Sequence, residues 1–447
     1  YLLQNPSPSI PAQVKVRFLT PSGAPLEKTY VVAPGSRANI WVNKEEFPAA
    51  GSGNFALAST DVSAVFEVTN GVPIVVERAM YLSRGGQMFA AGHGSAAVPA
   101  PSLTWLLAEG ATGPLFDEFI LLANPSDTPA QATITYLLEG GATYTRSLEV
   151  PANARRNVWV DFDQPDGTTG FPLANASLSA RVEVTNGVPI IVERAMYLSS
   201  QGRTFNAGHE SAGVTAPATT WFLAEGATGP YFDLFVLIAN PTSEVAQVRA
   251  TYLLPDGRRY QKDDTVGPNS RFNIWVDLVD IPGSGLVLAD TAVSTTVEST
   301  NGVPIIVERA MWWPGDFWTW HEAHNSAGAT STGTQWALAE GEVDASRNLE
   351  TYILIANTSA TLADVKVTLL FENGASAEQT YRDLPAHSRF NVPVGALFPE
   401  AAGRRFGAIV ESLGAEPAAI VVERAMYWDA VRQPWAAGTN ALATRLR

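Results

Sequence analysis

Residues 69–81 read Thr-Asn-Gly-Val-Pro-Ile-Val-Val-Glu-Arg-Ala-Met-Tyr, and close copies of this stretch stand at 185–197, at 300–312 and, in shorter form, at 420–427. The methionines of the four copies lie at positions 80, 196, 311 and 426, so the period is 115 or 116 residues. Self-similarity at a fixed period is the signature of a repeat architecture. The sequence therefore predicts four tandem copies of one unit.

Other stretches keep the same period. The segment Trp-x-x-Ala-Glu-Gly, called here the WxxAEG segment, occupies 105–110, 221–226 and 336–341. The pattern Arg-x-Asn-x-Trp occupies 37–41, 155–159 and 271–275, and 389–393 is its variant with proline in the last place. Small, turn-prone linkers separate the copies. We place the repeats at 1–103, 104–219, 220–334 and 335–447.

Within one repeat the pattern is typical of short strands. Residues 119–123 form an apolar run that ends at Asn124-Pro125, and residues 132–138 alternate before Glu139-Gly140-Gly141, a hairpin signal. We also expect Asn186-Gly187 to join the last two strands of repeat 2 as a tight hairpin. About seven strands per repeat and no amphipathic helix of ordinary length predict an all-β chain of four immunoglobulin-like β-sandwiches in an elongated array.

The first repeat begins at a different phase, because Tyr1 to Pro6 match residues 120–125 and no WxxAEG segment precedes them. Repeat 1 is therefore expected to lack its first strand. Three explanations stay open: the strand is missing from this stretch of chain, the chain is part of a longer array, or a neighbouring molecule supplies the strand. An open sheet edge favours pairing with another chain, and the third explanation predicts head-to-tail assembly.

Composition narrows the function classes. The chain of 447 residues has a formal net charge of −15, 46% hydrophobic residues and no cysteine. Nucleic acid and anionic membrane surfaces need clustered Lys and Arg, so neither is an expected partner. Disulfides and thiolate metal sites are excluded. We find no apolar stretch long enough to span a membrane.

The combination of the WxxAEG segment, strands ending in Ala-Asn-Pro and the Val-Glu-Arg-Ala-Met-Tyr signature resembles a tandem repeat of large secreted or cell-surface bacterial proteins. The resemblance covers essentially the whole chain. It implies an extracellular or cell-surface, β-rich, repetitive protein, and it brings no catalytic residues with it. Repeat 4 departs most, with Glu342-Val343-Asp344 where repeats 2 and 3 have small residues.

The repeated Glu-Arg pair is the most conspicuous polar feature. Neighbours on a strand point to opposite faces, so the two residues of a pair are not expected to bind each other. One of them must face inward, and by parity it is the arginine. A buried arginine needs a carboxylate partner, for which Glu183 or Glu109 is the candidate in repeat 2. We expect a structural polar network of Arg78, Arg194, Arg309, Arg424, Glu67, Glu183, Glu298 and Glu411.

No metal, cofactor or catalytic site is predicted. His93, His209 and His324 stand at related positions, but no metal-ligand spacing of the His-Glu-x-x-His kind occurs. A carboxylate beside arginine tends toward a low pKa, which does not suit a general acid. The acidic loops Asp161-Phe162-Asp163 with Asp166, and Asp277 with Asp280, are the candidates for calcium, with solvated turns as the alternative.

Repeat 3 carries a group of aromatic residues: Trp312, Trp313, Phe317, Trp318 and Trp320. Exposed tryptophans suit sugar stacking or partner contact, and packing beneath a neighbouring domain is the alternative. The leading expectation is a non-enzymatic extracellular rod or filament-forming protein that self-associates through repeat 1. The alternative is a carbohydrate-binding or adhesive array that uses Trp312, Trp313, Trp318 and Trp320.

Overall fold

The computed structural model describes residues 1–47, 54–84, 87–200, 203–314, 320–430 and 433–447. Strands form where the sequence alternates. In β10 (Ala130–Leu138) the residues at every second position are buried over the first half of the strand, and its partner β11 (Thr143–Val150) alternates in the same way. Gly140 and Gly141 between them both have φ near +85°, the backbone that a tight hairpin needs and that glycine adopts without strain.

Repeat 2 shows the complete unit, which consists of two antiparallel sheets of four strands. The outer sheet has the order β11-β10-β13-β8, with β8 at Thr104–Leu107 and β13 at Leu178–Val184. The axial sheet has the order β12-β9-β14-β15. Its strands are β9 (Phe116–Asn124), β12 (Ala154–Trp159), β14 (Ile191–Ser200) and β15 (Arg203–Ala212).

Repeat 3 follows the same plan, and repeat 4 adds the short strands β25 (Glu342–Val343) and β33 (Thr444–Arg445) to its outer sheet. In repeat 3 the strands are β16 (Thr220–Leu223), β17 (Asp233–Asn240), β18 (Ala246–Leu253), β19 (Arg259–Val266), β20 (Ser270–Trp275), β21 (Ser294–Ser299), β22 (Ile306–Trp313) and β23 (Glu322–Ala327). In repeat 4 they are β24 (Gln335–Leu338), β25 (Glu342–Val343), β26 (Glu350–Asn357), β27 (Ala363–Phe371), β28 (Ser376–Leu384), β29 (Ser388–Pro393), β30 (Arg404–Leu413), β31 (Ile420–Ala430), β32 (Gln433–Leu442) and β33 (Thr444–Arg445). The helix α1 (Val394–Leu397) is one turn long.

Repeat 1 differs in one strand. Its axial sheet has the order β4-β1-β6-β7, but its outer sheet is β3-β2-β5 and has three strands among the described residues. The strands are β1 (Leu2–Asn5), β2 (Ala12–Leu19), β3 (Leu26–Val32), β4 (Ser36–Asn39), β5 (Ser63–Val68), β6 (Val75–Arg84) and β7 (Gln87–Ala96). The outer sheet of repeat 1 thus has one strand fewer, among the described residues, than the outer sheet of repeat 2.

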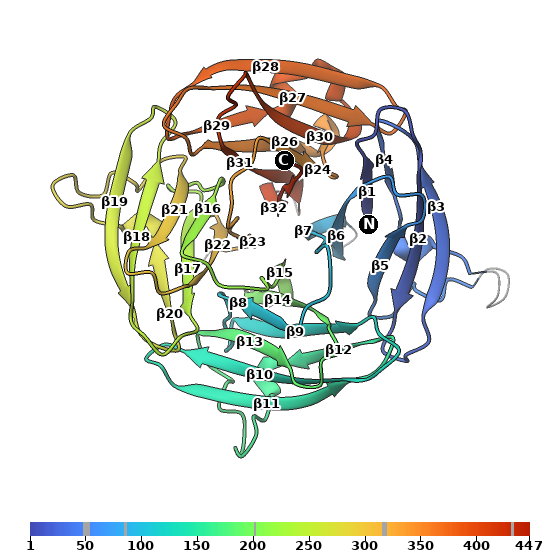
Figure 1. The fold of residues 1–447 in the computed structure, drawn as a ribbon, viewed down its shortest axis with the longest axis vertical. Helices are drawn as coiled ribbons and strands as arrows, with labels where there is room; N and C mark the ends of the chain where they lie inside the picture. Colours follow the sequence, from blue (N-terminus) through green and yellow to red (C-terminus); the bar gives the residue numbers. More distant parts are fainter. Residues whose placement is uncertain (48–53, 85–86, 201–202, 315–319, 431–432) are drawn as a thin grey trace.

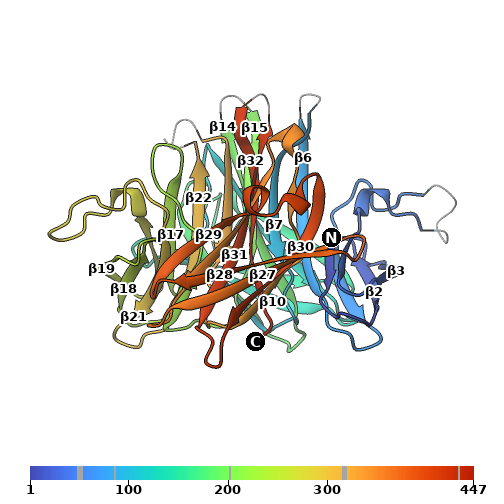
Figure 2. The same ribbon diagram turned by 90° about the horizontal axis from the view of Figure 1, so that it is seen from above.

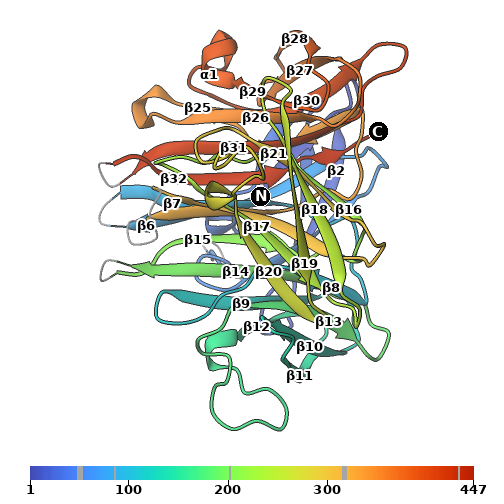
Figure 3. The same cartoon turned by 90° about the vertical axis from the view of Figure 1, so that its left-hand side faces the viewer.

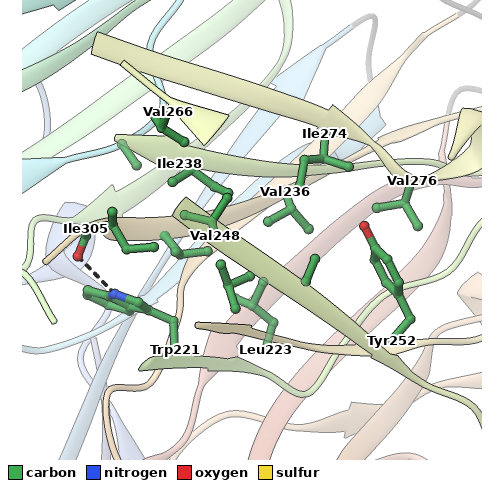
Figure 4. Close-up of a cluster of buried hydrophobic side chains, with 14 of the residues drawn as sticks. Trp221, Leu223, Val236, Ile238, Val248, Tyr252, Val266, Ile274, Val276 and Ile305 are labelled. Carbon is green, nitrogen blue, oxygen red and sulfur yellow. Dashed lines mark hydrogen bonds between the residues drawn. The ribbon is translucent and has the colours of Figure 1, made fainter. Parts of the chain in front are cut away.

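Each sandwich has its own apolar core. In repeat 3, Trp221, Leu223, Val236, Val248 and Tyr252 point into the space between the sheets and are almost fully buried (Figure 4). The indole nitrogen of Trp221 donates to the carbonyl of Ile305 at 3.0 Å, so the polar edge of the ring is satisfied. Trp105 and Trp336 make the same bond to the carbonyls of Ile190 and Ile420. The repeated tryptophan is therefore a core residue of the sandwich.

The four sandwiches form a closed ring. Figure 1 shows the hairpins β6–β7, β14–β15, β22–β23 and β31–β32 around a central axis, with β3, β11, β19 and β28 at the rim. Figures 2 and 3 show these hairpins running along the axis. The strands β7, β15, β23 and β32 each pack against at least two others of the four. Small residues permit this approach: a Cβ on Gly94 would lie 3.1 Å from the carbonyl oxygen of Asn440 and 3.3 Å from the guanidinium of Arg424.

Two expectations need correction, while the all-β class with several sandwiches is confirmed. The sandwiches do not extend in a line, because repeat 4 contacts repeat 1 through Arg424 and Glu77. Asn186-Gly187 is not a hairpin, because β13 belongs to the outer sheet and β14 to the axial sheet. The turn instead carries the chain from one sheet to the other.

Candidate functional site at the junctions between repeats

The two charges of each Glu-Arg pair face opposite neighbours in the ring. On β14, Arg194, Met196 and Leu198 share one face, and the last two pack against Ala310 and Trp312 of repeat 3. Glu193 lies on the other face and binds Arg78 of repeat 1 at 2.8 Å. The arginine face of one repeat therefore meets the glutamate face of the next, which is a heterologous contact that closes after four copies.

Arg309 shows the full set of contacts. Its guanidinium lies 2.8 Å from Glu225 in its own repeat and 2.8 Å from Glu423 in repeat 4, and all three side chains are buried. Burial raises the pKa of both carboxyls, although the guanidinium opposes the shift. Burial also acts to lower the pKa of Arg309, but the two carboxylates outweigh it and raise that pKa.

The same arrangement recurs at two further junctions. Arg194 lies 3.1 Å from Glu109 of the WxxAEG segment and 2.7 Å from Glu308 of repeat 3. Arg424 lies 2.7 Å from Glu340 and 3.1 Å from Glu77. The last pair joins residues at opposite ends of the chain and closes the ring. Each arginine therefore binds the WxxAEG glutamate of its own repeat and the paired glutamate of the next.

The glutamates also hold the backbone of the WxxAEG segments. Glu308, Glu423 and Glu77 accept from the amides of Ala108, Ala224 and Ala339 at 2.7–2.8 Å. Arginines of the Arg-x-Asn-x-Trp pattern add bonds to carbonyls of the same segments, namely Arg37 to Ala339, Arg271 to Gly110 and Arg389 to Gly226. A WxxAEG segment is therefore held by its own repeat and by the next one.

At the junction between repeats 1 and 2 the arginine also binds two carboxylates, but neither of them comes from a WxxAEG segment. Arg78 binds Glu193, and its second partner is Glu210 on β15 of repeat 2. Glu210 also lies 3.8 Å from His93, just as Glu109 and Glu225 lie 3.5 Å from His209 and His324. Glu210 thus makes the contacts that a WxxAEG glutamate makes elsewhere.

The carboxylates predicted in a network with the four arginines do not bind them. Glu183 pairs with Arg181, Glu411 lies near Lys366, and Glu67 and Glu298 are exposed on the outer sheets. All four lie on strands of the outer sheet, away from the arginines. The arginines of repeats 2, 3 and 4 bind the glutamates of the WxxAEG segments, of which the sequence pattern indicated Glu109 alone.

The expected glycan contact of the repeat 3 tryptophans also needs correction, because the described rings are buried. Trp312, Trp313 and Trp320 have 3%, 0% and 5% of their surface exposed, and Trp318 lies outside the described residues. Trp312 stacks on Trp320 at 5.0 Å between ring centroids, and Trp313 packs against Tyr427 of repeat 4. Contact between neighbouring repeats therefore covers the three described rings.

The calcium candidates serve as loop anchors. Asp161 accepts from the amides of Gly113 and Glu118, and Asp277 accepts from those of Gly229 and Leu234. Burial raises the pKa of Asp277 to about 6. Over the described ranges, no group of three or more acidic or histidine side chains has the arrangement of a metal site. Calcium binding at these loops stays a prediction.

Glutamate 322 joins three repeats close to the axis. It is fully buried on β23, and its two carboxylate oxygens accept from the amides of Gly208 in repeat 2 and Gly92 in repeat 1, each at 3.3 Å. Beside it, His324 contacts Arg309 at 3.2 Å and the hydroxyl of Tyr427 at 3.1 Å. Glu322 and His324 therefore connect neighbouring repeats.

The buried histidine His93 makes the stability of the folded chain depend on pH. Burial, and then the charge of Arg78, lower the pKa of His93 to about 3. Between pH 6.5 and 3 the unfolded state then binds a proton that the folded state does not, so stability falls as pH falls through this window. His93→Thr, which copies Thr439 of repeat 4, should remove about 3 kcal/mol of the loss between pH 7 and pH 4.

Urea denaturation at several pH values measures this difference, since carboxyl titrations common to both proteins cancel. The control is His387→Asn, because His387 is only half-buried and asparagine suits its φ of 50°. Burial also lowers the pKa of His387, but this ring is partly exposed, so the control should change the slope much less than His93→Thr does. An unchanged slope in His93→Thr would contradict the assignment of His93.

Comparisons with known proteins do not assign this chain to a family or a fold. No family model and no curated protein matches the chain. One solved structure, Thermotoga maritima 1070, has 18% identity over 25% of this chain and 94% of its own, with a TM-score of 0.22. The Anabaena sensory rhodopsin transducer has 20% identity over 22% and 91%, with a TM-score of 0.19. A tetra-tandem repeat from the extending region of a large adhesion protein has 11% identity over 99% and 94%, with a TM-score of 0.11. Such TM-scores do not establish a shared fold.

Proposed function

We propose that this chain is a non-catalytic structural and binding module of secreted or cell-surface material, in which four repeats act as one rigid ring. The observation that carries the proposal is the ion pair of Arg424 with Glu77, which closes the ring between repeats 4 and 1. The charged residues that recur in every repeat are engaged in joining repeats. In the described part of the chain, no helix has the length and apolar character to cross a membrane.

The closed ring differs from the rod and the head-to-tail assembly that the sequence favoured. A rod of linked sandwiches does not fit the contact between repeats 1 and 4. Head-to-tail assembly by strand exchange needs an acceptor edge and a free donor strand. Repeat 1 offers the acceptor at β5, whereas β8, β16 and β24 are paired within their own outer sheets. None of these three strands is therefore a free donor for such an exchange.

Small-angle scattering tests the ring directly. A compact chain of this length should have a radius of gyration of roughly 22 Å, and four sandwiches in a line would give a value well above that. The variant Glu77→Lys places a second cation beside the buried Arg424 and should open the ring, so the radius should rise.

The matched control is Glu67→Lys on the exposed face of β5, which should leave the radius unchanged. An extended particle for the native chain, or separate unfolding transitions for the repeats, would count against the proposal.

A further inference from the structure

Tyr427 of repeat 4 supplies a hydroxyl to two buried groups of repeat 3. It donates to the WxxAEG Glu225 at 3.0 Å, and it lies 3.1 Å from the Nε2 atom of His324. Tyr81 of repeat 1 donates in the same way to Glu340 of repeat 4. At both of these junctions a tyrosine of the following repeat therefore hydrogen-bonds the WxxAEG glutamate.

The junction between repeats 2 and 3 lacks this hydroxyl, because the residue at the tyrosine position of repeat 3 is Trp312. Its ring packs against that of His209 with 5.3 Å between the centroids, and both side chains are buried. Neither ring nitrogen of His209 makes a hydrogen bond to the described residues. The Nε2 atom of His209 lies 3.5 Å from a carboxylate oxygen of Glu109. Two titratable groups therefore face each other here without the hydroxyl that connects Glu225 and His324.

The surroundings of Glu109 favour its neutral form. The guanidinium of Arg194 lies 3.1 Å away, but Glu308 shares this cation and is nearer to it, at 2.7 Å. The side-chain amide of Asn325 donates to Glu109 at 2.7 Å. Burial raises the pKa of Glu109 to about 7; the charge of Arg194 opposes this shift, and that of Glu308 adds to it. The further charged or titratable side chains that act on the pair are Arg271, Arg309, Glu118, His93 and His324.

The imidazole of His209 is neutral, because burial and then the charge of Arg194 hold its pKa well below the ordinary value. A neutral imidazole accepts a hydrogen bond at Nε2 when its own proton is on Nδ1. A protonated carboxyl can donate that bond, whereas a carboxylate can only accept. The pair therefore has room for one proton in the place where two other junctions have a tyrosine hydroxyl.

We infer that Glu109 and His209 form a proton-binding site at the junction between repeats 2 and 3, in which Glu109 carries the proton and donates it to Nε2 of His209. When this proton leaves to solvent, Nε2 of His209 becomes the donor and Glu109 the acceptor. The ionised form buries a second carboxylate beside Arg194, so the ring responds to pH at this junction. The inference goes beyond the proposed function, because it concerns a response of the ring whatever the ring binds.

The pH dependence of stability gives two opposite signatures. Between about pH 4.5 and 6.5 the folded pair holds one proton, on Glu109, and the unfolded chain holds one, on His209, so their contributions cancel. In Glu109→Gln the folded pair holds none, so stability falls as pH falls. In His209→Thr, which copies Thr439 of repeat 4, the unfolded chain holds none, so stability falls as pH rises. Relative to the native chain, the unfolding constant in urea should change by up to about tenfold per pH unit, in opposite directions.

The tyrosine position supplies matched variants. Trp312 stacks on Trp320 at an interplanar angle of 23°, and Tyr427 stacks on Trp435 at the same angle, so Trp312→Tyr suits the site. Its hydroxyl should donate to Glu109, and a hydrogen bond to the charged form lowers the pKa of a carboxyl. Trp312→Tyr should therefore release the proton at lower pH. Tyr427→Phe should do the reverse at the next junction.

Nitrogen-15 NMR of the histidine rings observes the site in the native chain. The signals of His209 are identified by their absence in His209→Thr or by the contact of the ring with Trp312. Near pH 7 the two ring nitrogens should exchange their protonated and unprotonated signals without passing through an imidazolium. This exchange should be absent in Glu109→Gln and should move to lower pH in Trp312→Tyr.

Three results would overturn the inference: a His209 that keeps one tautomer between about pH 5 and 9, a His209 that becomes an imidazolium in that range, or a pH dependence that shifts in the same direction in Glu109→Gln and His209→Thr. A chain with the scattering of a closed ring and any of these results refutes this inference alone. An extended chain refutes the proposed function.

Discussion

Replacing Arg309 with leucine is expected to lower the free energy of unfolding by about 3–5 kcal/mol, because it leaves the buried carboxylates of Glu225 and Glu423 without their cation. Their side chains are 4% and 0% exposed, so water cannot take over the role of the guanidinium. Both pKa values are already raised by burial, and they should rise further. Urea denaturation followed by circular dichroism measures the loss.

Two further variants make this result specific. Arg249→Leu removes an arginine whose ion pair with Asp263 is on the surface, and it should leave the denaturation midpoint unchanged. Adding Glu225→Gln to Arg309→Leu removes one of the stranded charges and should recover part of the lost stability, which a double-mutant cycle would show as coupling. An Arg309→Leu protein as stable as Arg249→Leu would contradict the view that the junction is held by buried charge.

The repeat and its strands could be predicted because they depend on local patterns. The period of 115 or 116 residues, the alternation along residues 132–138 and the glycine pair at 140–141 each act within one unit. The prediction of a hairpin at Asn186-Gly187 was wrong because it too rested on a local pattern alone. A tight turn between two apolar runs fits both a hairpin and a crossing between sheets, and only the packing of the two sheets decides which one forms.

Ring closure depends on contacts that no local pattern specifies. Glu77 and Arg424 meet although they are 347 residues apart, and the angle between successive repeats is set by the fit of one arginine face to one glutamate face. One clue was present in the sequence. A glutamate and an arginine that recur side by side on an apolar strand need partners on both faces of that strand, and this indicates a neighbour on each side.

The tryptophans of repeat 3 show the same limit. Their clustering in the sequence suggested a binding surface, but neighbouring repeats cover the described rings. The informative exposure is found instead at Met80 and Leu82, whose sequence does not differ in character from that of their buried counterparts. Glu210 does give a sign in the sequence. When the four copies are aligned, it stands where the other repeats have asparagine or glycine.

Truncation of Trp221 to alanine should cost about 3–5 kcal/mol, since it removes the largest side chain of the repeat 3 core and leaves a cavity between the two sheets. Trp221 is fully buried, and its indole nitrogen donates to the carbonyl of Ile305. Trp221→Phe keeps most of the volume and loses this bond, so it should cost less. Trp41→Ala serves as the surface control, because 52% of Trp41 is exposed and substitutions at such sites usually change stability by less than about 0.5 kcal/mol.

The shape of the unfolding curve of Trp221→Ala tests how far the repeats depend on one another. The core of repeat 3 includes Leu106 and Ala108 of repeat 2, and Arg309 ties it to repeat 4. Damage to this core should therefore shift one cooperative transition of the whole chain to lower urea. A separate early transition that involves about a quarter of the signal, with the rest unchanged, would mean that the junctions contribute little and that each sandwich folds independently. A single shifted transition would mean that the stability of each core is shared around the ring, as expected if the junction ion pairs make the four repeats one folding unit.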